Sequence, residues 1–372
     1  MNRVISFIKK EAVLTIALLL ALVSAFVVKP GKEYIGYIDY HVLVLLFALM
    51  LVVGGFKSLG VFRLLGEKMC SKVKSLRSLT LVLTLLCFLS SMLITNDVAL
   101  ITFVPFTISV FCMIACEDKL IPVIVLETIA ANLGSMLTPI GNPQNLLLFS
   151  LSGMNVIHFV THMLPLTMMS LVLILICVAG LKNRPIQITQ KSDENQSKIL
   201  KSYSFWVYFA LFMVCMGNVF HLYSYWVVLG VVAVVVLVIN RSLFAEVDYS
   251  LLLTFVGFFI FIGNMKQIDS VNELLMQLIS GNELLMGIAT SQVISNVPAA
   301  MLLSGFTTEY GVLLYGVNIG GLGTLIASMA SLISYRFFVK AYPEQKSAYF
   351  RQFTAYNVVL LVIITVITML VL

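Results

Sequence analysis

The sequence predicts an all-α polytopic membrane protein built from an inverted structural repeat, with two re-entrant hairpins and two broken transmembrane helices. Three observations lead to this prediction. Of the 372 residues, 60% are hydrophobic and 11% are charged, and the mean hydropathy is +1.04, which excludes a soluble globular domain. Apolar stretches of about 17–25 residues, long enough to cross a bilayer, recur along the chain. Polar clusters interrupt these stretches at matching spacing in two halves of the chain.

Apolar segments follow one another along the chain, and we expect each of them to be helical. Their ranges are 11–29, 37–55, 78–94, 97–115, 120–140, 143–180 with a break near 152–157, 205–222, 224–240, 249–264, 284–306, 311–335 and 353–372. The stretch 57–77 mixes apolar and basic positions at helical spacing, which indicates a helix lying in the membrane interface. The polar stretch 182–203 is expected to be a cytoplasmic linker between the two halves.

Positive charge is distributed unevenly, and this distribution predicts the orientation of the chain. Three of the 23 Lys and Arg residues fall in segments assigned to the outer side, namely Lys29, Lys32 and Lys266. The others gather at 3–10, 57–77, 182–201 and 336–351, with single residues at 119 and 241. The positive-inside rule places those segments in the cytoplasm. We therefore expect a multi-pass protein of the plasma (inner) membrane, with its N-terminus cytoplasmic and, after nine full crossings, its C-terminus outside.

The polar interruptions of the two halves are related by a repeat. The aligned pairs are Asn96 with Asn296, Asn132 with Asn318, Thr138 with Thr324, Asn142 with Ser328, and Asn145 with Ser331. One extra crossing, 205–222, stands between the halves and inverts the second copy. Inverted repeats with discontinuous helices that meet at the midplane are the architecture of many secondary transporters.

The repeat predicts a domain organisation. Residues 1–181 are the first repeat, with an inward-opening hairpin at 78–115 and a broken helix at 120–155. After the linker, residues 204–372 hold the extra helix and the second repeat, with an outward-opening hairpin at 270–306 and a broken helix at 311–335. The alternative for 78–115 is two full crossings joined by a polar turn at residues 95–97.

The breaks carry the chemistry of a binding site. A broken helix exposes unpaired N–H groups at one new end and C=O groups at the other, so its ends attract anions or ligate Na⁺. The alternative is that these polar groups only hold helices together. The candidate substrate- and ion-binding residues are Thr95, Asn96, Asp97, Asn132, Thr138, Gly141, Asn142, Gln144, Asn145, Gln292, Ser295, Asn296, Asn318, Gly321, Thr324 and Ser328.

Two acids lie within apolar sequence, where charge costs at least about 2.5–3.5 kcal/mol at the bilayer centre. Asp97, at a hairpin tip, is the candidate to ligate a cation or carry a proton. Glu127, about two turns into its helix, is the second candidate coupling acid, expected to snorkel or to bind a neighbouring group. No Lys or Arg lies deep in an apolar segment. His158 and His162 have the i, i+4 spacing of a metal pair, but we interpret them as interfacial histidines.

At these motifs the chain resembles the ion transporter superfamily. It is most similar to the citrate-transporter-like branch, with the arsenite permeases and the NhaD-type antiporters, and more distantly to the divalent-anion/sodium symporters. The motifs are TNDVALITFVP (95–105), TPIGNPQNL (138–146) and SQVISNVPAAMLL (291–303). Both tips read Ser-Asn-Thr in the divalent-anion symporters, and Asp97 is closer to the arsenite and antiporter branch. The resemblance implies an elevator-type movement of the hairpin domain and a homodimer.

The sequence thus predicts a secondary active transporter that moves a small anion, such as a carboxylate, coupled to Na⁺ or H⁺. The alternatives are an arsenite efflux permease, an Na⁺/H⁺ antiporter and, behind these, an ion channel. No catalytic residues are expected, because the chain has no nucleotide-binding, hydrolase or metalloprotease motif. The expected partners are the lipid bilayer and the small anion, without nucleic acid. No cofactor is expected, and Na⁺ is the candidate coupling ion.

Overall fold

The computed structural model describes residues 11–70, 73–186 and 202–371. The basic segment 3–10 and most of the predicted linker 182–203 lie outside the described residues. Within them all regular secondary structure is helical, apart from a single isolated β-bridge between Ser75 and Pro185. Seven described helices are long and apolar enough to cross a membrane. The predicted all-α polytopic fold is confirmed.

Helices form at the predicted apolar segments, with boundaries set by caps and breaks. The first half contains α2 (Ala12–Val27), α3 (Glu33–Tyr37), α4 (Tyr40–Ser58), α5 (Val61–Cys70), α6 (Leu76–Ile94), α7 (Asn96–Met113), η1 (Glu117–Lys119), α8 (Leu120–Ser135), α9 (Pro143–Ser152) and α10 (Val156–Ala179). The second half contains α12 (Tyr203–Val219), α13 (Tyr225–Asn240), η2 (Arg241–Glu246), α14 (Tyr249–Lys266), α15 (Asp269–Ile279), α16 (Glu283–Ile294), α17 (Asn296–Ser304), α18 (Tyr310–Ile319), α19 (Met329–Ala341), η3 (Pro343–Gln345) and α20 (Lys346–Val371).

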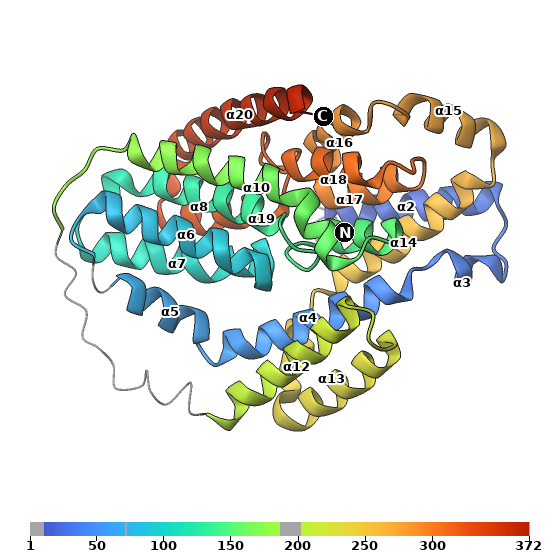
Figure 1. Ribbon diagram of the computed structural model, residues 1–372, viewed down its shortest axis with the longest axis horizontal. Helices are drawn as coiled ribbons and strands as arrows, with labels where there is room; N and C mark the ends of the chain where they lie inside the picture. Colours follow the sequence, from blue (N-terminus) through green and yellow to red (C-terminus); the bar gives the residue numbers. More distant parts are fainter. Residues whose placement is uncertain (1–10, 71–72, 187–201, 372) are drawn as a thin grey trace.

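The helices that precede the two hairpins pack across the halves. α2 packs against α14, and α4 against α13, so each half contributes one helix to each pair. A small residue permits the first contact, since a Cβ on Gly257 of α14 would lie 3.1 Å from the backbone of Ala17 on α2. α12 joins α4 and α13 along one side of the molecule (Figure 1). Together these helices form a frame beside the hairpins.

The first hairpin is held tightly against the first broken helix. α6 and α8 form the most extensive helix pair, and their backbones approach at Gly134, where a Cβ would overlap the carbonyl oxygen of Phe88. α7 packs on α8 and on α19 of the other half. The second hairpin, α16 and α17, packs in turn on α18 and α9. The hairpins and broken helices of both halves therefore form one body.

Basic residues gather at one end of the molecule, at the starts of α6 and α8 and after α10. At the basic end the Arg77 guanidinium donates to the Leu181 carbonyl at 2.9 and 3.2 Å, and Asp118 pairs with Lys119 at 3.0 Å and with Arg184 at 3.4 Å. The Lys119 ammonium, which donates a hydrogen bond to Asp118, is the main cause that lowers the pKa of that carboxyl. α3 and α15 lie at the opposite end from α5 (Figure 1).

Candidate functional site

Both hairpins turn on a residue with the same unusual backbone. Thr95 has φ 70° and ψ 150°, and Ser295 has φ 76° and ψ 154°. Positive φ is rare for residues other than glycine, and such strain gathers at functional sites where the surroundings fix it. The following residue begins a helix, and its N–H bonds into the break of the next helix. Asn96 N donates to Gly141 O at 3.2 Å, and Asn296 N to Ala327 O at 2.9 Å.

The two broken helices end and restart at aligned positions. α8 ends at Ser135, and α9 restarts with Asn142 as N-cap, whose side chain accepts from Asn145 N at 2.9 Å. Pro143 holds the first helical position, where its missing N–H costs nothing. α18 ends at Ile319, and α19 restarts after the N-cap Ser328. Six or more residues thus leave the helical path in each half.

The halves exchange hydrogen bonds at these breaks. Asn318 of the second half receives a bond from Asn142 at 3.1 Å and donates to Asn145 at 2.7 Å. Asn132, its counterpart in the first half, accepts from Ser328 at 3.0 Å and donates to Ser331 at 3.5 Å. Asn318 thus contacts Asn142 and Asn145, and Asn132 contacts Ser328 and Ser331. These two pairs of residues are aligned by the repeat, so the two halves make the same contacts on each other.

The hairpin tips join this network. Asn96 donates to Asn132 Oδ1 at 3.0 Å, and Asn132 donates in turn to Gly321 O at 3.4 Å. Gly321 also lies against the second tip, because a Cβ there would sit 2.9 Å from the Asn296 amide nitrogen. The four breaks therefore meet in one buried polar layer, whose aligned members Asn96, Asn132, Asn142, Asn145, Asn296, Asn318 and Ser328 are each 5% exposed or less.

A cavity of about 200 Å³ lies beside the first tip. Thr95, Asp97 and Asn142 line it from the first tip and the first break, and Lys57 and Asp248 line it from α4 and from the start of α14. Glu246 is a third acid in a wall that is otherwise mainly apolar. Asp97 Oδ1 is buried and has no hydrogen-bond partner among the described residues. A buried carboxylate oxygen without a partner is the kind of group that a proton or a cation satisfies.

The predicted residues outside this layer shape the breaks. Gln292 donates to Gly320 O and Leu322 O, both at 2.9 Å, and accepts from Thr324 N at 2.9 Å, so one side chain holds the open turn of the second half. In the first half Thr138, a residue of the break itself, donates to Met92 O and so ties the break to α6. Gln144 is buried on α9, and its Oε1 has no partner among the described residues.

Glu127 does not snorkel, which corrects one sequence-based expectation. Its side chain is fully buried and accepts a hydrogen bond from Thr107 on the neighbouring α7. It does not line the cavity beside Asp97. α8 carries it inward between α6 and α7, where the other expectation, contact with a neighbouring group, is met.

Among the described residues, His158 and His162 share no common partner. His162 stacks on Tyr315 with ring centroids 4.5 Å apart, and its Nε2 lies 3.0 Å from Gly311 O, which links α10 to α18. His158 is exposed one turn earlier. The described part of the chain holds no group of three or more residues suited to a metal ion.

Comparison with known proteins places the chain. The family model described as citrate transporter matches residues 4–310. The chain belongs to the citrate transporter family. The inner membrane protein YbiR of Escherichia coli is 34% identical over 317 residues, 84% of each chain. The uncharacterized transporter MJ0456 of Methanocaldococcus jannaschii is 34% identical over 327 residues, 87% of each chain. The silicon efflux transporter LSI3 of rice is 34% identical over 146 residues, which are 39% of this chain and 29% of that protein.

Family membership and the apolar helices confirm a multi-pass membrane transporter, as the motifs predicted. The structure adds polar residues of this citrate transporter family member that sequence reasoning missed. Ser135 accepts from Asn142 at 3.0 Å, and Thr128 of the first half donates to Ser334 of the second at 2.7 Å. The sequence could have indicated the two serines, since Ser135 lies three residues after the aligned Asn132 and Ser334 three residues after the aligned Ser331, both within apolar sequence.

Proposed function

We propose that the chain is a secondary active transporter for a small oxygen-rich solute, in first place an anion such as a carboxylate, coupled to Na⁺ or H⁺. The observation that carries the proposal is the polar layer in which four backbone breaks meet inside an apolar protein. Its carboxamides and hydroxyls donate and accept hydrogen bonds, and the helix ends add partial charges of both signs. Discontinuous helices of this kind build the sites of many secondary transporters.

The depth of the first turn supports a re-entrant hairpin rather than two crossings. α8 runs for 16 residues before its break, about 24 Å, and α9 runs for 10 residues beyond it, about 15 Å. The turn at Thr95 is hydrogen-bonded to Gly141 inside this break. The first hairpin therefore ends about 15 Å, the length of α9, before the opposite membrane surface. In the second half, α16 and α17 have 12 and 9 residues, too few to cross singly.

The two hairpins open at opposite ends, which supports alternating access. The first begins and ends at the basic end, beside Arg77 and Asp118. The second begins and ends where Thr307 donates to Glu283 at 3.0 Å, at the other end. By the positive-inside rule the basic end is cytoplasmic. We infer that each tip is reached from its own side. The elevator-type movement of the hairpin body against the frame, and the homodimer, remain predictions drawn from the resemblance.

Coupling is assigned to Asp97. It adjoins the tip amide Asn96 in sequence and presents an unpartnered carboxylate oxygen at the cavity. A cation or proton bound there compensates its charge, so that binding of the ion and of the solute become linked. The aligned residue of the second tip is Val297, so the hairpin itself does not require an acid at this position.

A second candidate function is the export of an undissociated oxyacid, as in an arsenite efflux permease. The observation that favours it is the charge of the cavity, where Asp97, Glu246 and Asp248 face a single Lys57. Three carboxylates against one ammonium repel a free anion unless a cation binds first. A neutral hydroxyl-rich solute meets no such repulsion, and one relative is named a silicon efflux transporter. Na⁺/H⁺ exchange, the third candidate, needs only Asp97.

A thermal-shift screen of the purified protein separates these candidates. Citrate, arsenite and silicic acid are added singly, each with Na⁺, Li⁺ or choline and at two pH values, because a ligand of the folded state raises its stability by mass action. Stabilisation by citrate that needs Na⁺ or low pH supports anion symport. Stabilisation by arsenite or silicic acid without that requirement supports oxyacid efflux. A response to Na⁺ and pH alone supports exchange, and no response to any addition would contradict all three.

A further inference from the structure

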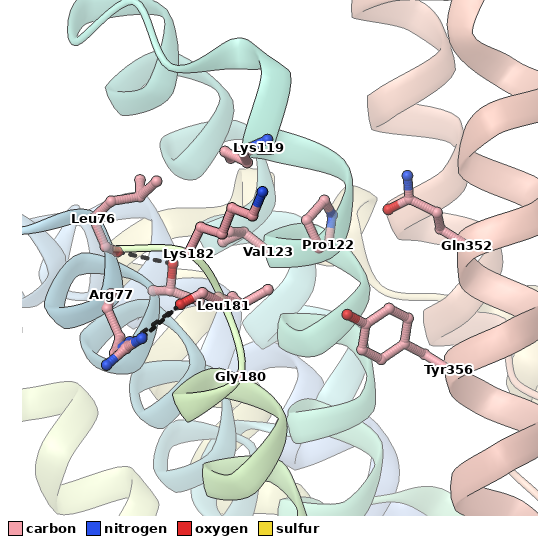
Figure 2. A pocket seen from close by; sticks show the side chains of 11 residues that line it. Leu76, Arg77, Lys119, Pro122, Val123, Gly180, Leu181, Lys182, Gln352 and Tyr356 are labelled. Atoms are coloured by element: carbon pink, nitrogen blue, oxygen red, sulfur yellow. Dashed lines mark hydrogen bonds between the residues drawn. The ribbon is translucent and has the colours of Figure 1, made fainter. Parts of the chain in front are cut away.

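A second cavity, of about 260 Å³, lies at the basic end, away from the polar layer. The starts of α6 and α8, the end of α10 and one face of α20 surround it (Figure 2). Arg77 lines it from α6, Lys119 from the residue before α8 and Lys182 from the segment after α10, and none of its lining residues is acidic. Gln352 and Tyr356 present an amide and a hydroxyl from α20 on the opposite wall (Figure 2).

The positive charge of this cavity is only partly neutralised. Arg77 spends two N–H groups on the Leu181 carbonyl, which carries no net charge. Lys119 shares Asp118 with Arg184, so that one carboxylate serves two cations. Lys182 forms no ion pair within the described residues. A pocket that gathers cations at the end of a helix bundle attracts an anionic group.

The surroundings favour an anion attached to an apolar tail. α10 packs against α20, and both helices present exposed apolar side chains on the path away from the cavity. Val359 and Val362, one and nearly two turns beyond Tyr356, are 55% and 54% exposed, and Ile176 of α10 is 61% exposed. These apolar side chains can contact acyl chains, while Lys119 and Lys182 in the cavity can contact a phosphate. Basic pockets between transmembrane helices on the cytoplasmic side are typical lipid headgroup sites.

We propose that this cavity binds a phosphate group, supplied by an anionic phospholipid whose chains lie along α10 and α20. Lys119 and Lys182 contact the phosphate, and Tyr356 and Gln352 donate hydrogen bonds to the headgroup. Arg77 acts as a positioning residue, because it fixes the end of α10 to the start of α6. The lipid joins the C-terminal helix α20 to the base of the first hairpin. The proposal does not depend on which solute is carried.

The test measures phospholipid binding to the full-length protein in neutral detergent, by native mass spectrometry and thermal unfolding, with phosphatidylglycerol or phosphatidylcholine at equal concentration. We expect phosphatidylglycerol to bind and raise Tm, and phosphatidylcholine to do so far less. The double variant Lys119→Gln with Lys182→Gln should bind phosphatidylglycerol about 30-fold more weakly, taking about 1 kcal/mol for each lysine near the lipid surface.

Two further variants distinguish loss of the binding site from unfolding of the protein and from a general effect of removing positive charge. Arg336→Gln with Lys340→Gln removes the same charge from exposed positions on α19 and should leave binding unchanged. Asp118→Asn removes the carboxylate that competes for Lys119, so binding should become tighter, which a purely structural role does not predict. Equal loss in both double variants, or no loss in the Lys119 and Lys182 variant, overturns the proposal.

Sodium phosphate, compared with sodium chloride at equal ionic strength, distinguishes the source of the phosphate. If the phosphate salt raises Tm in the parent but not in the Lys119 and Lys182 variant, and phosphatidylglycerol does not, the site takes a soluble phosphate. If only phosphatidylglycerol acts, the source is the membrane. If neither raises Tm or binds, the cavity is not a phosphate site.

Discussion

Replacing Asp97 by Asn tests the coupling mechanism most directly. The substitution keeps the shape of the side chain and one oxygen ligand, and it removes the charge. Since Oδ1 is buried without a partner among the described residues, its exchange for an amide breaks no hydrogen bond in which that atom takes part. The first turn, held by Asn96 N on Gly141 O, is unaffected. We therefore expect the variant to fold and to lose the ion dependence of binding and transport.

The magnitude follows from the charge that is lost. A cation about 4 Å from the carboxylate gains about 4 kcal/mol at an effective dielectric constant of about 20, and removing water from both groups offsets part of this gain. Measured couplings between two ligands are about 1–3 kcal/mol, or about 5–150-fold. We expect Asp97→Asn to weaken the binding of a coupling Na⁺ by about tenfold or more. If the coupling ion is H⁺, the variant loses the titrating group altogether.

The assay needs no knowledge of the solute. The stabilisation of the purified protein is followed as NaCl replaces choline chloride, and again across pH, and uptake into proteoliposomes follows once a solute is found. A tenfold weaker site reduces stabilisation from about 2.7 to about 1.4 kcal/mol at a Na⁺ concentration of about 100 times the parent Kd. Asp248→Asn is the matched control, because it removes a charge from the same cavity while Asn still caps α14 at Leu251 N. If Asp97→Asn keeps the Na⁺ and pH dependence of the parent, the coupling role is wrong and Glu127 becomes the next candidate.

Three further substitutions test the site. In a Cys-free background Thr95→Cys should react with an impermeant maleimide from the cytoplasmic face, since its cavity also contains Lys57; labelling from the outer face alone would mean that 78–115 crosses twice. Asn142→Ala removes an N-cap and deprives Ser135 Oγ and Asn318 Oδ1 of the hydrogen bonds that the Asn142 amide donates to them, which costs about 1 kcal/mol for the cap and about 1–3 kcal/mol for each buried acceptor. We expect a lower Tm and lost transport, whereas the exposed Thr324→Ala should be nearly neutral, and equal effects of the two variants would exclude a special role for Asn142. Glu127→Gln should fold and keep the parent's ion dependence, because the amide oxygen still accepts from Thr107; loss of ion dependence in uptake assays would return Glu127 to the coupling machinery.

The sequence predicted the helices well, because length and hydropathy decide what crosses a bilayer. It also predicted the breaks, since Gly141, Pro143 and the glycines after Asn318 interrupt the pattern in a way that periodicity reveals. It did not predict which residues meet. Nothing local indicates that Asn318 bonds to Asn145, or that Asn132 bonds to Ser331, because these partners lie 173 and 199 residues apart. The sequence left open whether Glu127 snorkels or binds a neighbouring group for the same reason, since a residue's depth in its own helix says nothing of the helices around it.

The exchange of bonds between the halves has a consequence for biosynthesis. During synthesis Asn132 cannot bond to Ser328 until another 196 residues have been made, and Asn142 cannot bond to Asn318 until another 176 have been made. At about 5–20 residues per second, the ribosome takes roughly 10–40 s to supply the missing partners. Over that interval the newly inserted first half holds amides that hydrocarbon cannot satisfy. These unpaired amides must stay hydrated, or be shielded by the insertion machinery, until the second half has been synthesised and inserted. Slowing elongation in the second half should therefore lower the yield of folded protein more than slowing it in the first.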